Sequence, residues 1–278
     1  MTDTTLDTER IEHLLDGADV GDLRLTVVGL GSGGAFTVQP LVMSGVRQWD
    51  LFDPDLLEPV NLVKHPASRT WLGKPKVEAV SAWMLDRNPA VEARAHQEDV
   101  RKAAGFEEAA RASRLVLCAV DDPAARSWVN AQCVRLRRPC LTGSVIRTGL
   151  GGQVYLYAPG ETGCFDCMQR VADGNGANLE DALDLTEEER RHRYGLGDEN
   201  FTTSGLAGDI SLVASFQASM AWAVLMGGRS RYVPPLNFNW LTVGIRPEPG
   251  VFSARYETKR MLVRPQRDCH LGCAGGDG

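Results

Sequence analysis

Four glycines follow an apolar run near the amino end of the chain and open a segment with helical character: Gly29, Gly31, Gly33 and Gly34. The run over residues 23–28 has the pattern of a buried strand. Glycines between a strand and a helix permit a tight turn, and the free N–H groups at the start of the helix can bind phosphate. Asp53 stands 19 positions after Gly34, at the end of the next expected strand, where a carboxylate can reach ribose hydroxyls. This spacing predicts a nucleotide site, and it does not separate a dinucleotide from ATP.

Four of the seven cysteines form two short-spaced pairs: Cys164 with Cys167, and Cys269 with Cys273. Four thiolates of this kind suit a closed tetrahedral Zn²⁺ site. His270 is an alternative ligand, because the second pair is one residue wider than the common CxxC spacing. A redox role fits less well, since no strand–CxxC–helix context of the thioredoxin type surrounds the first pair. The other three cysteines are expected to be inert buried thiols: Cys118, Cys133 and Cys140.

Composition narrows the class of protein. The chain has 278 residues, of which 43% are hydrophobic and 24% charged, and this excludes a disordered, collagen-like or disulfide-dense chain. Its 30 Lys and Arg against 36 Asp and Glu give a net charge of −6, which argues against a broad nucleic-acid or anionic-membrane surface. The first ten residues contain no apolar signal segment, so we expect a cytoplasmic protein with reduced thiols and without a membrane or nucleic-acid partner. The apolar stretch over 211–228 is interrupted by Ser and Gln and is expected to be a buried core helix.

The order of elements indicates the fold. Strand-like runs over 23–31, 46–53, 91–97 and 114–120 alternate with amphipathic segments, one of them over 76–88. Such alternation implies right-handed crossovers and a parallel sheet with helices on both faces. After Gly151 the run GGQVYLYAP is typical of an antiparallel strand, and the runs over 238–245 and 252–260 can pair with each other. We therefore predict an α/β fold, a Rossmann-like sheet that is mostly parallel with antiparallel C-terminal strands.

A series of linked motifs, from Leu23 to Cys273, resembles the ThiF/MoeB/HesA family of ubiquitin-activating-enzyme-like adenylyltransferases. The family pattern runs D-x-D, S-N-L-x-R-Q, G-x-x-K-x-x-A and N-P. The corresponding positions here are Asp53 and Asp55, then Asn61, Lys64 and His65, then Gly73 and Lys76, then Asn88 and Pro89. The resemblance continues through Asp121, Asp122, Arg126, Asn130, both cysteine pairs and the segment around Asp209.

The resemblance implies a role for each position and three cofactors, namely ATP, Mg²⁺ and structural Zn²⁺. The glycines 29, 31, 33 and 34 would cradle phosphate, and Asp53 or Asp55 would bind ribose. The phosphates would contact Asn61, Lys64 and Lys76, and Asp121 would bind Mg²⁺. The two cysteine pairs would hold the zinc. Each residue also has an ordinary alternative, such as a solvated helix charge for Lys76 or an N-cap before Pro123 for Asp121.

Two positions depart from the family. Lys64 and His65 replace the usual Arg-Gln, and Lys keeps the charge but loses bidentate geometry. Family members often receive an Arg from the N-terminal helix of a partner subunit; Arg10 is the candidate, although the leader around it does not match the usual pattern.

The implied organisation is a helical leader over 1–22 and an adenylation domain over 23–278. Its nucleotide-binding part covers 23–150, and a zinc-clamped part with a crossover loop over 173–203 covers 151–278.

No cysteine occurs between Met168 and Asp268, where thioester-forming relatives carry a reactive thiol. The resemblance therefore implies an adenylyltransferase that stops at the acyl-adenylate. It would be a homodimer that activates the C-terminal carboxylate of a ubiquitin-like or sulfur-carrier protein, or of a precursor peptide, and releases pyrophosphate. Two alternatives remain: an inactive scaffold of the same fold that binds nucleotide or a ubiquitin-like partner, and an NAD-dependent oxidoreductase.

Overall fold

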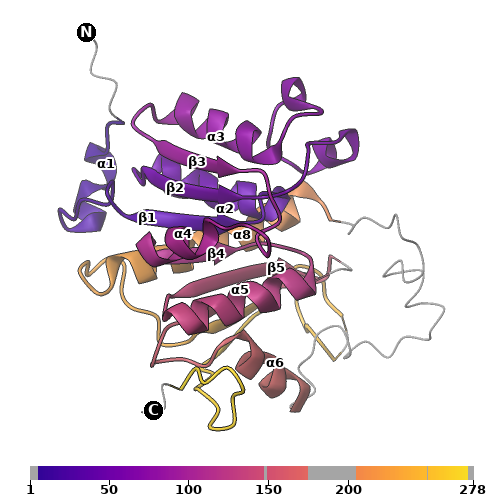
Figure 1. The fold of residues 1–278 in the computed structure, drawn as a ribbon. Helices are drawn as coiled ribbons and strands as arrows, with labels where there is room; N and C mark the ends of the chain where they lie inside the picture. Colours follow the sequence, from indigo (N-terminus) through magenta and orange to yellow (C-terminus); the bar gives the residue numbers. More distant parts are fainter. Residues whose placement is uncertain (1–5, 147–148, 175–204, 249, 275–278) are drawn as a thin grey trace.

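A computed structural model of the chain describes residues 6–146, 149–174, 205–248 and 250–274 (Figure 1). Its centre is a sheet of eight strands in the order β3-β2-β1-β4-β5-β6-β7-β8. The strands are β1 (Arg24–Val28), β2 (Gln48–Phe52), β3 (Glu92–His96), β4 (Leu115–Cys118), β5 (Cys140–Val145), β6 (Gly151–Tyr157), β7 (Trp240–Gly244) and β8 (Thr258–Met261).

The direction of pairing changes once across the sheet. Strands β3, β2, β1, β4 and β5 are parallel, whereas β6, β7 and β8 join them by antiparallel pairing. The prediction of a mostly parallel Rossmann-like sheet with antiparallel C-terminal strands is confirmed. The expected strand over 252–260 is shorter than predicted, because the chain turns at Tyr256, whose φ of 63° lies in the left-handed region.

Helices cover both faces of the sheet, as predicted. One face carries α2 (Ser32–Met43), α3 (Lys76–Arg87) and α8 (Ala207–Met226), whose apolar side chains join one core cluster with strand residues such as Leu25 and Leu241. The other face carries α4 (Phe106–Ala112), α5 (Pro123–Leu136) and α6 (Phe165–Gly174), packed in a second cluster. In Figure 1, α4 and α5 lie in front of the sheet and α8 lies behind it.

The apolar helix α8 is the expected core helix, and it begins four residues before the predicted segment. By length and composition it is the one helix among the described residues that could cross a membrane, but more than half of it is buried in the fold. The buried amide of Gln217 donates to the carbonyls of Cys118 (3.2 Å) and Leu141 (2.8 Å) and accepts from the Thr37 hydroxyl (2.9 Å). One side chain thus joins α8 to β4, β5 and α2.

From residue 6 on, the leader lies at the amino ends of the parallel strands, beside the start of β1 (Figure 1). It contains α1 (Glu9–Glu12) and a 3₁₀ turn (His13–Leu15), and Leu15 packs on Met226 at the end of α8. The Ser230 hydroxyl donates to the Leu14 carbonyl at 2.6 Å. The crossover loop predicted over 173–203 lies almost wholly outside the described residues, and its first position, Asp173, belongs to α6.

Candidate nucleotide and metal sites

The predicted nucleotide residues come from the carboxyl ends of three neighbouring strands. Gly29 follows β1, Asp53 follows β2 and Asp121 lies three residues beyond β4. Because β2 and β4 lie on opposite sides of β1, the chain leaves β1 at the position where open α/β sheets bind ligands. The Gly29 N–H donates to the Phe52 carbonyl at 2.9 Å, which continues the pairing of β1 with β2 beyond the strand ends.

The four glycines divide into two kinds. Gly29 has a φ of 88°, and a Cβ there would lie 2.9 Å from the backbone of Ala119. A Cβ on Gly34 would overlap the Gly29 carbonyl oxygen. These two glycines therefore let the turn close on itself and against β4. A Cβ on Gly31 or Gly33 would meet nothing within 4 Å, so these two positions face open space.

Helix α2 starts in this turn with its first N–H groups unused. Its first internal hydrogen bond runs from the Ala35 N–H to the Gly31 carbonyl at 2.9 Å. Within the described part of the chain, the N–H groups of residues 31–34 have no hydrogen-bond acceptor, and no acidic residue stands in the first turn. The positive end of a 12-residue helix therefore faces the open space, which suits an anion.

The two candidate ribose carboxylates have different environments. Asp53 is 5% exposed, and its two oxygens accept the N–H groups of Leu30 (2.6 Å) and Asp55 (2.9 Å). Burial raises the pKa of Asp53, while Lys76 and the two N–H groups act in the opposite direction. The Asp55 side chain is 61% exposed and forms an ion pair with the Lys76 ammonium, with 2.7 Å between Oδ2 and Nζ. Asp53 thus fixes the turn, and Asp55 is the more accessible carboxylate.

Lys76 opens helix α3 and is mostly buried, with 8% of the residue exposed. Its ordinary alternative, a solvated helix charge, therefore does not describe it. A buried ammonium needs a counter-ion, and Asp55 supplies one. A phosphate that replaced Asp55 at Lys76 would keep this charge compensated.

The segment with the Lys-His departure lies beside the glycine turn. Burial lowers the pKa of Lys64, with Asp121 opposing the shift and Lys76 adding to it, so all three groups lie within electrostatic range. The Asn61 side-chain oxygen accepts the Glu58 N–H at 2.9 Å, which caps the 3₁₀ turn Pro59–Val63 and leaves its NH₂ group as the donor for a ligand.

The two neighbouring aspartates after β4 separate clearly. Asp122 is the N-cap of α5, because its side chain accepts the Ala124 N–H at 2.8 Å, and it also pairs with Arg101 at 3.1 Å. Asp121 is exposed and makes no such cap. The N-cap alternative weighed for Asp121 therefore belongs to Asp122. A single accessible carboxylate fits Mg²⁺, which usually keeps several waters and takes one or two carboxylates plus phosphate oxygens.

Arg10 does not lie in the nucleotide site of its own chain. It is an exposed residue of α1, at the amino ends of the parallel strands, whereas the glycine turn lies at their carboxyl ends (Figure 1). Three other residues, quoted only as motif positions, have defined contacts. His65 is close to the glycine turn, Arg126 donates to the Val120 carbonyl at 2.9 Å, and Asn130 contacts α6. The only sequence signal for these three residues was their position in the family motifs.

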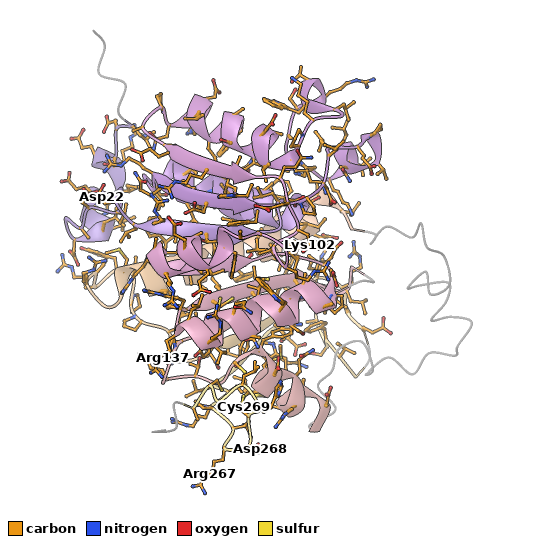
Figure 2. The ribbon with its side chains drawn as sticks, in the orientation of Figure 1. Asp22, Lys102, Arg137, Arg267, Asp268 and Cys269 are labelled. Carbon is orange, nitrogen blue, oxygen red and sulfur yellow. The ribbon has the colours of Figure 1, made fainter. Side chains whose placement is uncertain are left out.

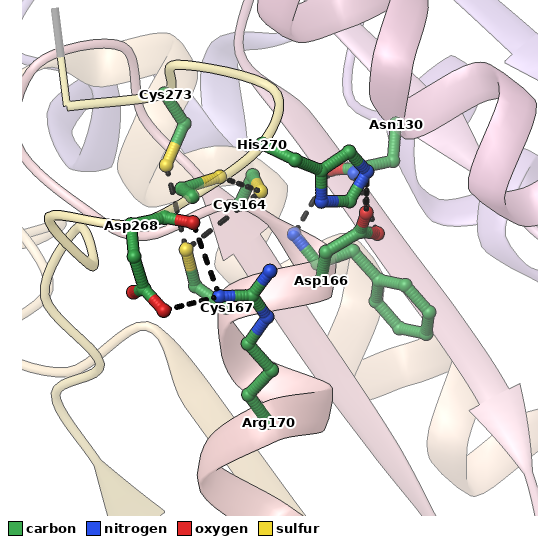
Figure 3. A network of polar contacts seen from close by, with 10 residues as sticks. Asn130, Cys164, Asp166, Cys167, Arg170, Asp268, His270 and Cys273 are labelled. Atoms are coloured by element: carbon green, nitrogen blue, oxygen red, sulfur yellow. Dashed lines mark hydrogen bonds and ion pairs between the residues drawn. The ribbon is translucent and has the colours of Figure 1, made fainter.

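The four paired cysteines meet where the start of α6 lies beside the segment that follows β8 (Figure 3). Their sulfur atoms all lie within 4.8 Å of one another, with separations of 3.9 Å (Cys164–Cys167), 3.6 Å (Cys164–Cys269) and 3.5 Å (Cys167–Cys273). Four sulfurs held tetrahedrally at ~2.3 Å from Zn²⁺ would be about 3.8 Å apart, so the observed set fits this ion. Figure 2 shows Cys269 at the lower end of the molecule, away from Asp22, which marks the approach to β1.

Polar contacts hold the two cysteine segments together from outside the cluster (Figure 3). Buried Asn130 accepts the Phe165 N–H at 2.9 Å and donates to Asp166 at 3.1 Å. Asp166 in turn lies 3.3 Å from the His270 ring, and Arg170 pairs with Asp268 at 3.0 Å. His270 is therefore engaged by Asp166, and the sulfur set is complete without it.

The remaining three cysteines are all buried thiols, as expected: Cys118, Cys133 and Cys140. Burial raises the pKa of Cys118 to about 12, which leaves it protonated at neutral pH. A protonated, inaccessible thiol is a poor nucleophile.

Comparison with known proteins identifies the family to which this chain belongs. The sequence profile of the ThiF family matches residues 12–246. Ubiquitin-like modifier-activating enzyme 5 of Arabidopsis thaliana is 25% identical over 273 residues, covering 90% of this chain and 60% of that protein. Its counterpart in Branchiostoma floridae is 27% identical over 168 residues, covering 56% and 42%. The chain thus spans about half the length of the curated relatives it matches.

Solved structures show the same fold. The E. coli MccB structure with AMPCPP and MccA has a TM-score of 0.71 and 20% identity, covering 94% of this chain and 69% of that one. The structure of PaaA has a TM-score of 0.68 and 17% identity, covering 95% and 86%. These likenesses establish the ThiF/MccB architecture. Since the family profile covers well over half of the sequence, this protein belongs to the ThiF family.

Proposed function

We propose that this protein is an adenylyltransferase that binds Mg²⁺ and ATP at the carboxyl ends of β1, β2 and β4. It would activate the C-terminal carboxylate of a ubiquitin-like protein, a sulfur-carrier protein or a peptide. One observation supports this most directly. The carboxyl ends of these strands bring together the two open glycine positions and the unused N–H groups of α2. Two lysines and an accessible carboxylate lie at the same place.

The chemistry needs little covalent help from the protein. The substrate carboxylate attacks the α-phosphorus of ATP, an acyl-phosphate bond forms, and the α–β bridging bond breaks to release pyrophosphate. Negative charge spreads over the phosphate oxygens during this step, so positioning and cationic groups provide the catalysis. Lys76, Lys64 and the N–H groups of residues 31–34 would provide it, with Asn61 as an additional donor. Mg²⁺ held by Asp121 would neutralise phosphate charge.

Relatives support the class of substrate. The matched curated relatives are named as activating enzymes of ubiquitin-like modifiers, and the MccB structures contain ATP, or AMPCPP together with MccA. The gap in cysteines between Met168 and Asp268 adds that the acyl-adenylate passes directly to an acceptor. A thioester would require a thiol at a position where this chain has none.

Two further assignments complete the proposal. Zn²⁺ would occupy the four-cysteine cluster in a structural role, since a closed set of four sulfurs leaves no position for substrate. The active form would be a homodimer in which Arg10 of one copy serves the site of the other, because α1 lies far from the glycine turn of its own chain.

ATP–pyrophosphate exchange tests the proposal. Radiolabelled pyrophosphate should enter ATP only when a suitable carboxylate is added, so the assay uses a panel of ubiquitin-like proteins ending in Gly-Gly and short peptides. ATP binding without exchange across the whole panel would favour the inactive scaffold, an alternative motivated by the Lys64 departure and by the lack of a cysteine between Met168 and Asp268. Tighter binding of NAD than of ATP would overturn the adenylyltransferase assignment.

A further inference from the structure

One buried imidazole connects the glycine turn to the segment that carries Lys64. His65 is 5% exposed; its Nε2 lies 2.8 Å from the Leu30 carbonyl oxygen and its Nδ1 lies 3.1 Å from the Ala67 nitrogen. A backbone N–H only donates, so Nδ1 must be the acceptor. The ring proton therefore sits on Nε2 and is donated to Leu30.

Leu30 stands in the middle of the turn and is held from both sides. Its N–H donates to Asp53 at 2.6 Å, its carbonyl accepts from His65, and its side chain is fully buried. In a planar trans peptide the carbonyl of one residue and the N–H of the next point in opposite directions. Because the Leu30 carbonyl accepts from His65, the Gly31 N–H points away from the imidazole, and this N–H has no acceptor among the described residues.

The same residue fixes the neighbouring segment. The backbone N–H groups of Lys64 and His65 both donate to the Asn61 carbonyl, at 3.0 and 2.8 Å. The compact turn that presents Asn61 and Lys64 is thus anchored, through the His65 ring, to the backbone that would receive phosphate. Loss of the ring would release both partners at once.

We propose that His65 is a positioning residue whose imidazole holds the glycine turn and the Lys64 segment in the arrangement that receives the triphosphate of ATP. This inference rests on the proposed nucleotide site and deepens it. It assigns a task to the His that stands where the family pattern has Gln. Glutamine also carries an N–H donor on a side chain of similar reach.

The charges around the ring give the proposal a second consequence. Lys76 is within electrostatic range of both His65 and Lys64, and Asp53 accepts the N–H of the Leu30 residue that the ring contacts. Burial, together with Lys76, lowers the pKa of His65, against the opposing effect of the Leu30 bond. The neutral ring is the form that makes both hydrogen bonds. ATP affinity should therefore be complete above about pH 6.5 and decline as the pH falls through the lowered pKa of His65.

The experiment measures equilibrium binding of ATP with Mg²⁺ by calorimetry, from pH 5 to pH 8, for the full chain and three variants. His65→Leu should weaken ATP binding about tenfold at pH 7.5, as expected for the loss of one hydrogen bond that orients the site. His65→Gln should bind within about threefold of the parent chain and lose the acid decline specific to His65. Protonation of ATP itself affects both proteins equally, so it cancels in this comparison. His270→Gln, beside the cysteine cluster and with a side chain that is 61% exposed, is the matched control and should behave as the parent chain.

The outcomes are distinct. Parent-like affinity and pH profile in His65→Leu would overturn the role of His65, as would an unchanged acid decline in a folded His65→Gln protein. The Gln comparison also decides the question if His65→Leu does not fold. Absence of ATP binding in the parent chain would overturn the proposed nucleotide site itself.

Discussion

The proposed nucleotide site and the four-cysteine cluster are assembled in different ways. At the proposed nucleotide site, residues come from the carboxyl ends of three adjacent strands, and the first N–H groups of α2 have no acceptor among the described residues. At the cysteine cluster, the thiols face one another and come from segments 105 residues apart. The first cluster is open and held by its own backbone, whereas the second is closed and joins distant parts of the chain.

This difference separates activity from stability. A side chain at the open edge has little to stabilise in the absence of ligand, so its removal should mainly reduce turnover. A cysteine in the closed cluster holds two segments together, so its removal should mainly reduce the free energy of unfolding. Four substitutions, each with a matched control, test the contrast.

The largest expected effect is on stability. Cys273→Ser should release the metal and lower the free energy of unfolding by about 4 kcal/mol, the order of the chain entropy of a loop of roughly 100 residues. Metal content by mass spectrometry and thermal unfolding measure both quantities. Cys118→Ala removes a buried thiol outside the cluster and should keep the metal at a cost of ~1 kcal/mol. Equal metal content in the two variants would contradict the zinc site.

Lys76→Ala should lower ATP–pyrophosphate exchange by about 10³-fold, because it removes a mostly buried cation from the region of the developing charge. Unfolding should change little, since Asp55 can then be solvated. Lys74→Ala is the control two positions away. Lys74 is exposed over the Trp71 ring, 4.7 Å from its centroid, and its loss should leave exchange within about threefold. Similar losses in both variants would show that general positive charge, and not Lys76, matters.

The adjacent aspartates should separate two functions. Asp121→Asn should lower exchange by about 10²-fold, with partial recovery at high Mg²⁺, and leave thermal unfolding unchanged. Asp122→Asn tests the N-cap of α5. Ala at this position should cost about 1 kcal/mol of stability, while Asn, itself a good cap, should cost less. A Mg²⁺-dependent defect in Asp122→Ala and none in Asp121→Asn would reverse the assignment.

The glycine turn provides the finest test. Gly31→Ala fits the free protein, so stability should be retained while ATP affinity falls about tenfold because the methyl group occupies phosphate space. Gly34→Ala places a methyl group on the Gly29 carbonyl and should lower stability by ~2 kcal/mol. Full ATP affinity in Gly31→Ala would mean that the open space is not the phosphate position.

The sequence could predict what depends on pattern. Strand and helix periodicity yielded the mostly parallel sheet, and paired spacing identified the four cysteines that meet. It could not predict which of two like residues does which task. Asp121 and Asp122 are adjacent residues of the same type, and only the structure of the first turn of α5 shows that Asp122 is the N-cap.

The sequence also could not predict long-range contacts. Nothing in its motif indicates that His65 reaches the carbonyl of Leu30, 35 residues earlier. The Lys76–Asp55 pair likewise depends on how the segment after β2 folds back on α3. The left-handed turn at Tyr256 shortened a predicted strand, because periodicity does not register a single unfavourable φ.

The contacts of Gln217 have a consequence for the order in which this protein can mature on the ribosome. The carbonyls of Cys118 and Leu141 emerge long before residue 217, and the amide that satisfies them arrives only with α8. Helix α2, which flanks the glycine turn, also contacts Gln217 through the Thr37 hydroxyl, and this contact forms only after α8 has been synthesised. A nascent chain ending near residue 150 would expose the apolar face that α8 covers, and we expect chaperones to engage it there. The proposed nucleotide site would form late, although its motifs are translated first.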